Sequence, residues 1–240
     1  MNFKLNQQIF SERYLNNEIE VFIKRLDLID PFISGNKLFK LKHNVDRALL
    51  EKKNMLITFG GAFSNHILAT AAYAKKKNID CLAIVRGEEY SELNPLLTLA
   101  KEYGMNFCFV SRKEYAKRND NNYISELIRK YKKAFIVPEG GNNKLGVLGA
   151  EEILETQDKS FDYIICPIGT GATLSGIVNS SNRSQKVIGI NCINDTKDIN
   201  KNISQKTNKN NWEIINEFNF GGFAKFDNLL TEYLKKFKLN

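Results

Sequence analysis

The chain has 240 residues, of which 42% are hydrophobic, so it can form one large domain or two small ones with real cores. Its formal net charge is +8, but the basic residues are scattered over segments with helical periodicity. That pattern is typical of solvated helix faces and argues against a nucleic-acid partner. No apolar run is long enough to span a membrane, and residues 1–10 lack the apolar core of a signal peptide. We therefore expect a cytoplasmic protein without a membrane partner.

Strand-like and helix-like patterns alternate along most of the chain. It starts with an extended segment at 19–26, a turn at Asp30-Pro31 and a helix from Lys37 to about Lys53. Strands are then predicted at 55–59, 81–85, 107–110, 135–137, 163–166, 187–193 and 212–218. Two helices are predicted to begin at Ser64 and at Pro95. Three more are predicted at 123–131, 145–154 and 229–237, and another, after residue 173, is predicted to end near Asn179. The polar stretch 194–211 is predicted to be a long surface loop.

This alternation predicts an α/β fold. The strands are almost continuously apolar, which indicates parallel sheets buried on both faces. Functional sites in such sheets lie at the carboxyl ends of the strands. Three loops at such ends are rich in glycine and polar residues, namely residues 60–66, 138–143 and 169–173. They are the first places to look for a site.

The cysteines do not indicate a metal site or a disulfide. There are four of them, each in or beside an apolar run, and none forms a C-x-x-C pair. Only two histidines are present. We therefore expect buried, reduced thiols and no metal, for Cys81, Cys108, Cys166 and Cys192.

Lys37 is the strongest single candidate for chemistry. Gly35 and Asn36 precede it, which indicates a tight turn, and Leu38 and Leu41 follow at helical spacing. A lysine at a helix start meets unpaired amides and the positive end of the helix dipole, and partial burial acts in the same direction. These effects favour the neutral amine that carbonyl chemistry requires. The alternative is an ordinary surface lysine, because lysine and arginine together number 35.

The loop Gly169-Thr170-Gly171-Ala172-Thr173 lies between a predicted strand and a predicted helix. Its glycines allow close approach of a ligand, and the helix N-terminus favours an anion. It lacks the Lys-Ser/Thr ending of a P-loop and the dinucleotide spacing. We favour a phosphate-binding loop over a plain strand-to-helix turn.

Ser64, Asn65 and His66 form a second polar group at a helix start. One interpretation is that the serine and asparagine merely cap the helix. The preceding Gly60-Gly61 and the third polar residue fit a site for a carboxylate or a cofactor hydroxyl better. The turn Pro138–Asn143 follows another strand, and for it a loop shaped by backbone needs is at least as good an interpretation as ligand contact.

A lysine amine, a phosphate cradle and a polar pocket are the parts of a pyridoxal phosphate site. The sequence resembles the 1-aminocyclopropane-1-carboxylate deaminase/D-cysteine desulfhydrase family, within the tryptophan-synthase-β-like fold of pyridoxal phosphate enzymes. The resemblance covers roughly residues 15–230. The matching motifs are Gly35-Asn36-Lys37-x-x-Lys40-Leu41, Gly60-Gly61-Ala62-Phe63-Ser64-Asn65-His66, Pro138-Glu139-Gly140-Gly141-Asn142 and Gly169-Thr170-Gly171-x-Thr173.

The resemblance implies roles for these residues. Lys37 would bond covalently to pyridoxal 5'-phosphate and move protons at the substrate. Asn65 would contact the cofactor ring hydroxyl, and Ser64, Asn65 and His66 would hold the substrate carboxylate, with Ser64 as a further proton relay. Lys40 would assist in binding the cofactor. The phosphate would be bound by Gly169, Thr170, Gly171, Ala172 and Thr173.

The resemblance also implies the domain organisation and the activity. The fold would consist of two open parallel-sheet domains, with a small domain at 45–149 inserted into a large one made of 1–44 and 150–240. The reaction would be lyase or deaminase chemistry on a small amino acid, of the D-cysteine or 1-aminocyclopropane-1-carboxylate type, releasing ammonia and a 2-keto acid. A homodimer is the family habit.

The sequence departs from the family pattern at two points. Ala172 replaces a glycine common in the phosphate loop, which requires a negative φ there. Family members also continue past the segment Phe220–Lys225, with residues that complete the site. We therefore weigh an active enzyme against a homologue that keeps the fold and binds the cofactor with little or no turnover.

Overall fold

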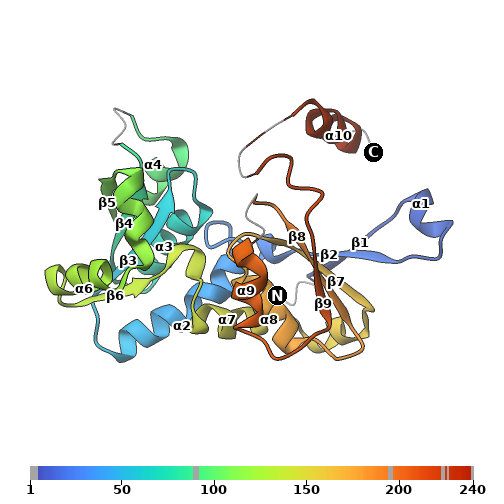
Figure 1. The fold of residues 1–240 in the computed structure, drawn as a ribbon, viewed down its shortest axis with the longest axis horizontal. Coiled ribbons are helices and arrows are strands. Elements are labelled where there is room, and N and C mark those ends of the chain that lie inside the picture. The colour runs from blue at the N-terminus through green and yellow to red at the C-terminus, as the bar shows by residue number, and fades with distance from the viewer. Residues whose placement is uncertain (1–4, 89–91, 194–196, 223–224, 226, 239–240) are drawn as a thin grey trace. The chain divides into compact units, whose positions relative to one another are not determined.

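Figure 1 shows the computed structural model of the chain, which describes residues 5–88, 92–193, 197–222, 225 and 227–238. The chain divides into two compact units, Met1–Gly140 and Gly141–Asn240. The assignment of 1–44 and 150–240 to one domain stays a prediction. Of the family-like segment 220–225, residues 223 and 224 lie outside the described residues.

Unit 1 begins with a short antiparallel pair, β1 (Asn6–Ile9) with β2 (Val21–Lys24), around α1 (Glu12–Leu15). The turn η1 (Leu26–Leu28) and the long helix α2 (Asn36–Leu50) follow. Between them the Asp30 carboxylate accepts hydrogen bonds from the backbone N–H groups of Phe32 and Ile33. The turn predicted at Asp30 is therefore present, closed by its own side chain.

The main sheet of unit 1 has four parallel strands in the order β5-β4-β3-β6. They are β3 (Met55–Gly61), β4 (Asp80–Arg86), β5 (Met105–Val110) and β6 (Ala134–Val137). The helical elements between them are α3 (Asn65–Lys76), α4 (Pro95–Glu102), α5 (Arg112–Tyr115), η2 (Ala116–Asn119) and α6 (Asn121–Lys130).

Alternate residues of the central strands enter two different cores. Leu56 and Val85 pack in one buried cluster with Ile67 of α3, whereas Ile57 and Ile84 pack in another with Tyr115. Both faces of the sheet are therefore covered, which is why its strands have near-continuous apolar sequences. The parallel sheet predicted from that pattern is confirmed.

Unit 2 holds a three-stranded parallel sheet in the order β7-β8-β9. Its elements are α7 (Lys144–Glu151), η4 (Thr156–Ser160), β7 (Tyr163–Ile168), α8 (Ala172–Ser180), β8 (Lys186–Asn191), α9 (Lys197–Ser204), β9 (Trp212–Ile215) and α10 (Asn228–Lys238). The turn η3 (Glu139–Gly141) precedes them. The strand predicted at 212–218 ends at Ile215.

The long surface loop predicted at 194–211 is wrong for residues 197–204. Residues 194–196 lie outside the described residues, but α9 occupies Lys197–Ser204. Ile199 and Ile203 are buried in the core of unit 2 with Leu174 and Val178 of α8. Two isoleucines four residues apart supply an apolar helix face, and the polar composition around them concealed it.

The expected burial of all four cysteines is also wrong. Cys81 and Cys166 are buried, Cys108 is half-buried, and Cys192 is exposed. Cys192 follows the last residue of β8, so it lies past the buried part of the sheet.

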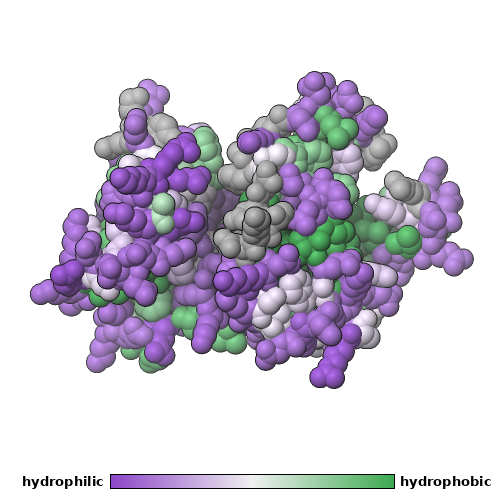
Figure 2. Space-filling model, in the orientation of Figure 1, coloured by the Kyte–Doolittle hydropathy of each residue, from purple (hydrophilic) through white to green (hydrophobic). Residues whose placement is uncertain are grey.

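The lysine run at 75–77 is solvated, as predicted. Lys75, Lys76 and Lys77 are all exposed at the end of α3. Hydrophilic residues cover most of the face of the molecule seen in Figure 2. Within the described ranges, every helix is too short or too polar to cross a membrane.

Candidate active site

Lys37 lies in the first turn of α2, where the sequence places it. The helix begins at Asn36, and Gly35 before it has φ +63°. A side chain at Gly35 would meet nothing within 4 Å, so glycine is required there by the left-handed backbone and not by space. The Lys37 Nζ donates a hydrogen bond to Asn36 Oδ1 at 2.8 Å.

The protein environment favours the neutral form of the Lys37 amine. Burial lowers the pKa of Lys37 below its ordinary value. Desolvation disfavours the ammonium and leaves more free amine at a given pH. The predicted lowering of the pKa of this lysine is confirmed, and burial is its cause.

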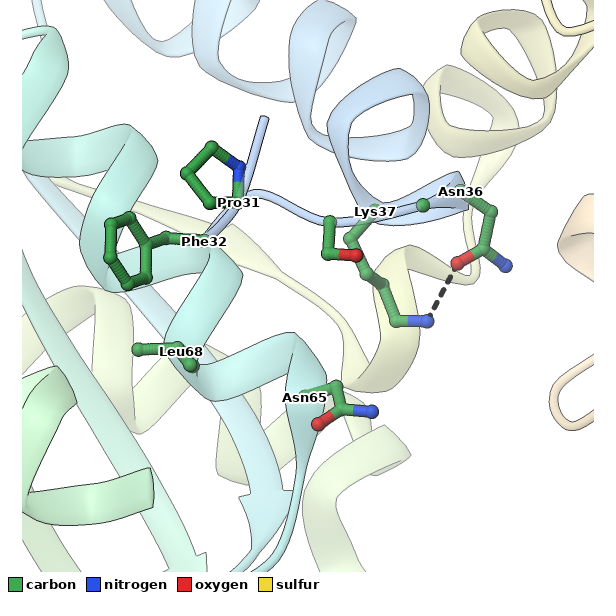
Figure 3. A pocket seen from close by; sticks show the side chains of 8 residues that line it. Pro31, Phe32, Asn36, Lys37, Asn65 and Leu68 are labelled. Atoms are coloured by element: carbon green, nitrogen blue, oxygen red, sulfur yellow. Dashed lines mark hydrogen bonds between the residues drawn. The ribbon is translucent and has the colours of Figure 1, made fainter. Parts of the chain in front are cut away.

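Lys37 lines a cavity of about 350 Å³ in unit 1. This volume lies in the range of small-molecule sites. Figure 3 shows Lys37, Asn36 and Asn65 extending on one side of the cavity, with Phe32 and Leu68 on the other. The structure thus brings together two residues assigned to the cofactor, Lys37 and Asn65, although they come from different helices.

The loop before α3 holds its backbone closely against the helix. A side chain at Gly60 would come within 2.8 Å of both Ile67 and Ser64. Ser64 is the N-cap residue of α3, yet its side chain makes no capping hydrogen bond. The alternative interpretation of Ser64 as a capping side chain is therefore wrong, and the hydroxyl and the first amides of the helix are open to a ligand.

His66 and Lys40 are the two polar side chains among the predicted site residues that are buried in protein. His66 is 2% exposed and Lys40 3% exposed. Burial, with the positive charges of Lys40 and Lys37, holds the pKa of His66 well below its usual range. The imidazole is therefore neutral at physiological pH.

Unit 2 contains the predicted phosphate loop at the start of α8. Gly171 is the N-cap with φ +88°, and Ala172 is the first helical residue. Ala172 has no positive φ, so its methyl group causes no backbone strain, as the sequence requires. Nothing lies within 4 Å of a side chain built on Gly169, so the loop is open on that side. Amides of the first helical turn can serve as hydrogen-bond donors to an anion there.

Sequence reasoning missed the residue that supports this loop. A side chain on Gly171 would meet Ile203 of α9 at 3.2 Å. The helix that was predicted to be a loop therefore packs beneath the phosphate loop. The sequence signal for this helix was the pair of apolar residues Ile199 and Ile203.

The third loop, after β6, is held by its backbone and by one acidic side chain. Gly140 and Gly141 have φ near +64° and +65°. Glu139 accepts hydrogen bonds from the Tyr115 hydroxyl at 2.8 Å and from Arg118 Nε at 2.6 Å. Burial and the Glu139 carboxylate raise the pKa of Tyr115, so it stays a hydroxyl donor. These contacts favour the structural interpretation of this turn, and no sequence pattern signalled Tyr115 or Arg118.

The family described as "Pyridoxal-phosphate dependent enzyme" matches residues 7–212 of the sequence. The chain belongs to this family. The match includes all three loops and Lys37, so the cofactor predicted from the sequence, pyridoxal phosphate, is that of the family.

Individual relatives agree with the resemblance seen in the motifs. A putative 1-aminocyclopropane-1-carboxylate deaminase of Thermotoga maritima is 29% identical over 248 residues, covering 94% of this chain and 78% of the relative. The bifunctional D-cysteine desulfhydrase/1-aminocyclopropane-1-carboxylate deaminase of Arabidopsis thaliana, a mitochondrial protein, is 33% identical, covering 68% of this chain but 45% of the relative. The chain thus spans less than half of the Arabidopsis protein.

A solved structure confirms the fold. The crystal structure of a homologue of 1-aminocyclopropane-1-carboxylate (ACC) deaminase has a TM-score of 0.79 at 25% identity, covering 96% of this chain and 76% of that chain. The α/β fold with parallel sheets predicted from the sequence is therefore the fold of these pyridoxal phosphate enzymes.

Proposed function

We propose that the chain is a pyridoxal-phosphate-dependent lyase or deaminase acting on a small amino acid of the D-cysteine or ACC type, releasing ammonia and a 2-keto acid. The observation that carries the proposal is the half-buried Lys37 amine, with its lowered pKa, in a cavity of about 350 Å³ beside Asn65. The similarity to relatives named for these activities supports the choice of substrate class.

Each unit, taken by itself, offers groups that fit one part of the cofactor. Lys37 offers the amine that bonds to its aldehyde, Asn65 an amide for the ring hydroxyl, and the first turn of α8 a site for the phosphate. Lys40 is assigned to the cofactor by the same motif. When bound, pyridoxal phosphate supplies an electron sink that stabilises negative charge on the substrate carbon.

The substrate carboxylate is assigned to the start of α3. The Ser64 hydroxyl, which makes no capping hydrogen bond, and the first amides of the helix provide donors. The helix dipole favours an anion there. Ser64 would then also exchange a proton with the substrate. The neutral Lys37 amine would take a proton from the α-carbon of a D-cysteine-type substrate; ACC has no hydrogen on that carbon, so there the proton would come from a ring methylene group.

Product release tests this proposal directly. The chain, saturated with pyridoxal phosphate, is given D-cysteine or ACC, and ammonia and 2-keto acid are measured, with L-cysteine as the control. We expect both products in equal amounts from at least one of the two substrates. Binding of the cofactor, seen by its absorbance, without either product would instead identify a cofactor-binding protein that lacks turnover.

Thr173→Ala should weaken cofactor binding. Removing a hydroxyl that donates to a charged phosphate costs about 1.5–3 kcal/mol, or roughly ten- to a hundredfold in affinity. Thr173→Ser keeps the hydroxyl and is the matched control. Titration with pyridoxal phosphate measures both variants. Equal affinity of Thr173→Ala and the unchanged chain would place the phosphate elsewhere.

A further inference from the structure

His66 is connected by two hydrogen bonds to the strands at the centre of unit 1. Its Nε2 lies 2.9 Å from Thr58 Oγ1, and Thr58 Oγ1 donates to the backbone carbonyl of Val137 at 2.9 Å. Thr58 of β3 and Val137 of β6 are also paired in the parallel ladder. The chain of bonds therefore joins the first turn of α3 to the middle of β3 and to the carboxyl end of β6.

The chemistry of these partners fixes the position of the imidazole proton. The Val137 carbonyl can only accept, so the single hydroxyl proton of Thr58 is used there. Thr58 Oγ1 must then accept from His66, which places the proton on Nε2. The Nδ1 atom consequently carries the lone pair, and it is buried without a hydrogen-bond partner in the described part of the chain.

These constraints leave the His66 side chain without a donor for an anion. Its one N–H is directed at Thr58, and a lone pair on Nδ1 repels a carboxylate. We infer that His66 is a positioning residue, whose side chain holds the start of α3 against β3 and the carboxyl end of β6, and that its imidazole does not bind the substrate carboxylate. This differs from the role that the family resemblance implies for His66.

The surroundings of His66 agree with this inference. Its own backbone carbonyl accepts from Thr70 Oγ1 at 2.8 Å, so both ends of the residue are fixed. The positive charges of Lys40 and Lys37 add to burial in disfavouring an imidazolium. Asn65, one residue earlier, lines the cavity with Lys37, and Ser64 and Asn65 keep the roles proposed for them. The sequence feature that indicates a partner for His66 is Thr58, a polar residue within the apolar run 55–59.

The inference rests on the proposed function only in naming the anion, and its main test does not need turnover. The chain contains two histidines, so ¹⁵N-labelled imidazoles give two sets of signals, and His43→Gln assigns them. In the cofactor-loaded protein we expect His66 in the Nε2–H form, with an Nδ1 signal that does not move on adding ACC or D-cysteine. An Nδ1–H form, an imidazolium, or an Nδ1 shift on adding either amino acid would overturn it.

A pair of variants at Thr58 tests the positioning role. Thr58→Val removes both hydrogen bonds, whereas Thr58→Ser restores the hydroxyl. For Thr58→Val we expect the affinity for ACC, read from the absorbance of the bound cofactor, to fall about two- to tenfold and the His66 signals to shift. Thr58→Ser should reverse both effects. Unchanged affinity in a folded Thr58→Val protein would contradict positioning, and the tautomer of the unsubstituted chain decides the matter if that variant does not fold.

Discussion

Replacing Lys37 with alanine is expected to abolish covalent attachment of pyridoxal phosphate and to lower amino-acid turnover at least about a thousandfold. A positioned acid–base group alone is typically worth 10²–10⁴ in rate, and Lys37 is also the proposed covalent anchor. Its amine is the one in the cavity, and its pKa is already lowered by burial. Product assays at saturating cofactor, together with the visible absorbance of the protein, measure both effects.

Lys42→Ala is the matched control, because Lys42 lies in the same helix but does not line the cavity. It should retain the cofactor band and the turnover of the unchanged chain. Turnover of Lys37→Ala within tenfold of that value would show that another group performs the chemistry.

The lowered pKa of Lys37 has a direct consequence for the pH dependence of cofactor attachment. Only the neutral amine attacks the aldehyde, so the rate falls as the pH decreases through the pKa of Lys37. An ordinary lysine has a pKa near 10.4. Since burial lowers the pKa of Lys37, half of the maximal rate should be reached at a lower pH than for an ordinary lysine. Stopped-flow absorbance between pH 7 and 10.5, against a lysine peptide, checks this sign. A midpoint at or above that of the peptide would contradict the burial argument.

The largest loss of stability is expected for Gly146→Ala in α7. A side chain at Gly146 would lie 1.9 Å from the Gly141 carbonyl oxygen and 3.3 Å from Asn143 Oδ1. The carbonyl is held in place, because it accepts from Asn143 N–H at 3.0 Å while Asn143 Oδ1 accepts from the Gly146 N–H at 2.8 Å. Alanine normally favours a helix by about 1 kcal/mol over glycine. Here the clash reverses the sign, and we expect a loss of at least about 2 kcal/mol.

Thermal unfolding followed by circular dichroism measures this loss, which should lower the midpoint by at least about 4 °C. Gly169→Ala is the control, because its new methyl group would meet nothing within 4 Å. It should unfold like the unchanged chain. A Gly146→Ala protein as stable as that control would mean that the turn after Gly141 adapts without cost.

The regular parts of the fold could be predicted because their apolar patterns are uninterrupted. Strands such as β3 and β4 are buried on both faces, so their sequences alone indicate a parallel sheet. Among the elements that escaped prediction are a strand and a helix with largely polar sequences. The strand β1 has the sequence Asn-Gln-Gln-Ile and pairs through its backbone, and α9 has only Ile199 and Ile203 in a polar stretch.

The candidate site could be predicted as residue types in motifs, but not as contacts. The position of Lys37 at a helix start follows from the glycine and asparagine before it. The orientation of the His66 imidazole does not follow from its neighbours in the sequence. It depends on Thr58, eight residues away, and on Val137, which is far along the chain. The bonds of Tyr115 and Arg118 to Glu139 likewise exist only once the sheet brings them together.

Borohydride reduction of the cofactor-loaded chain, followed by peptide mapping, tests the central claim most directly. Reduction fixes the cofactor on whichever lysine carries it, so the result does not depend on turnover or on the identity of the substrate. The burial of the amine and its place in the cavity predict a single pyridoxyl group on Lys37. A label on Lys40, on Lys42 or on any other lysine, with Lys37 unmodified, would contradict the account.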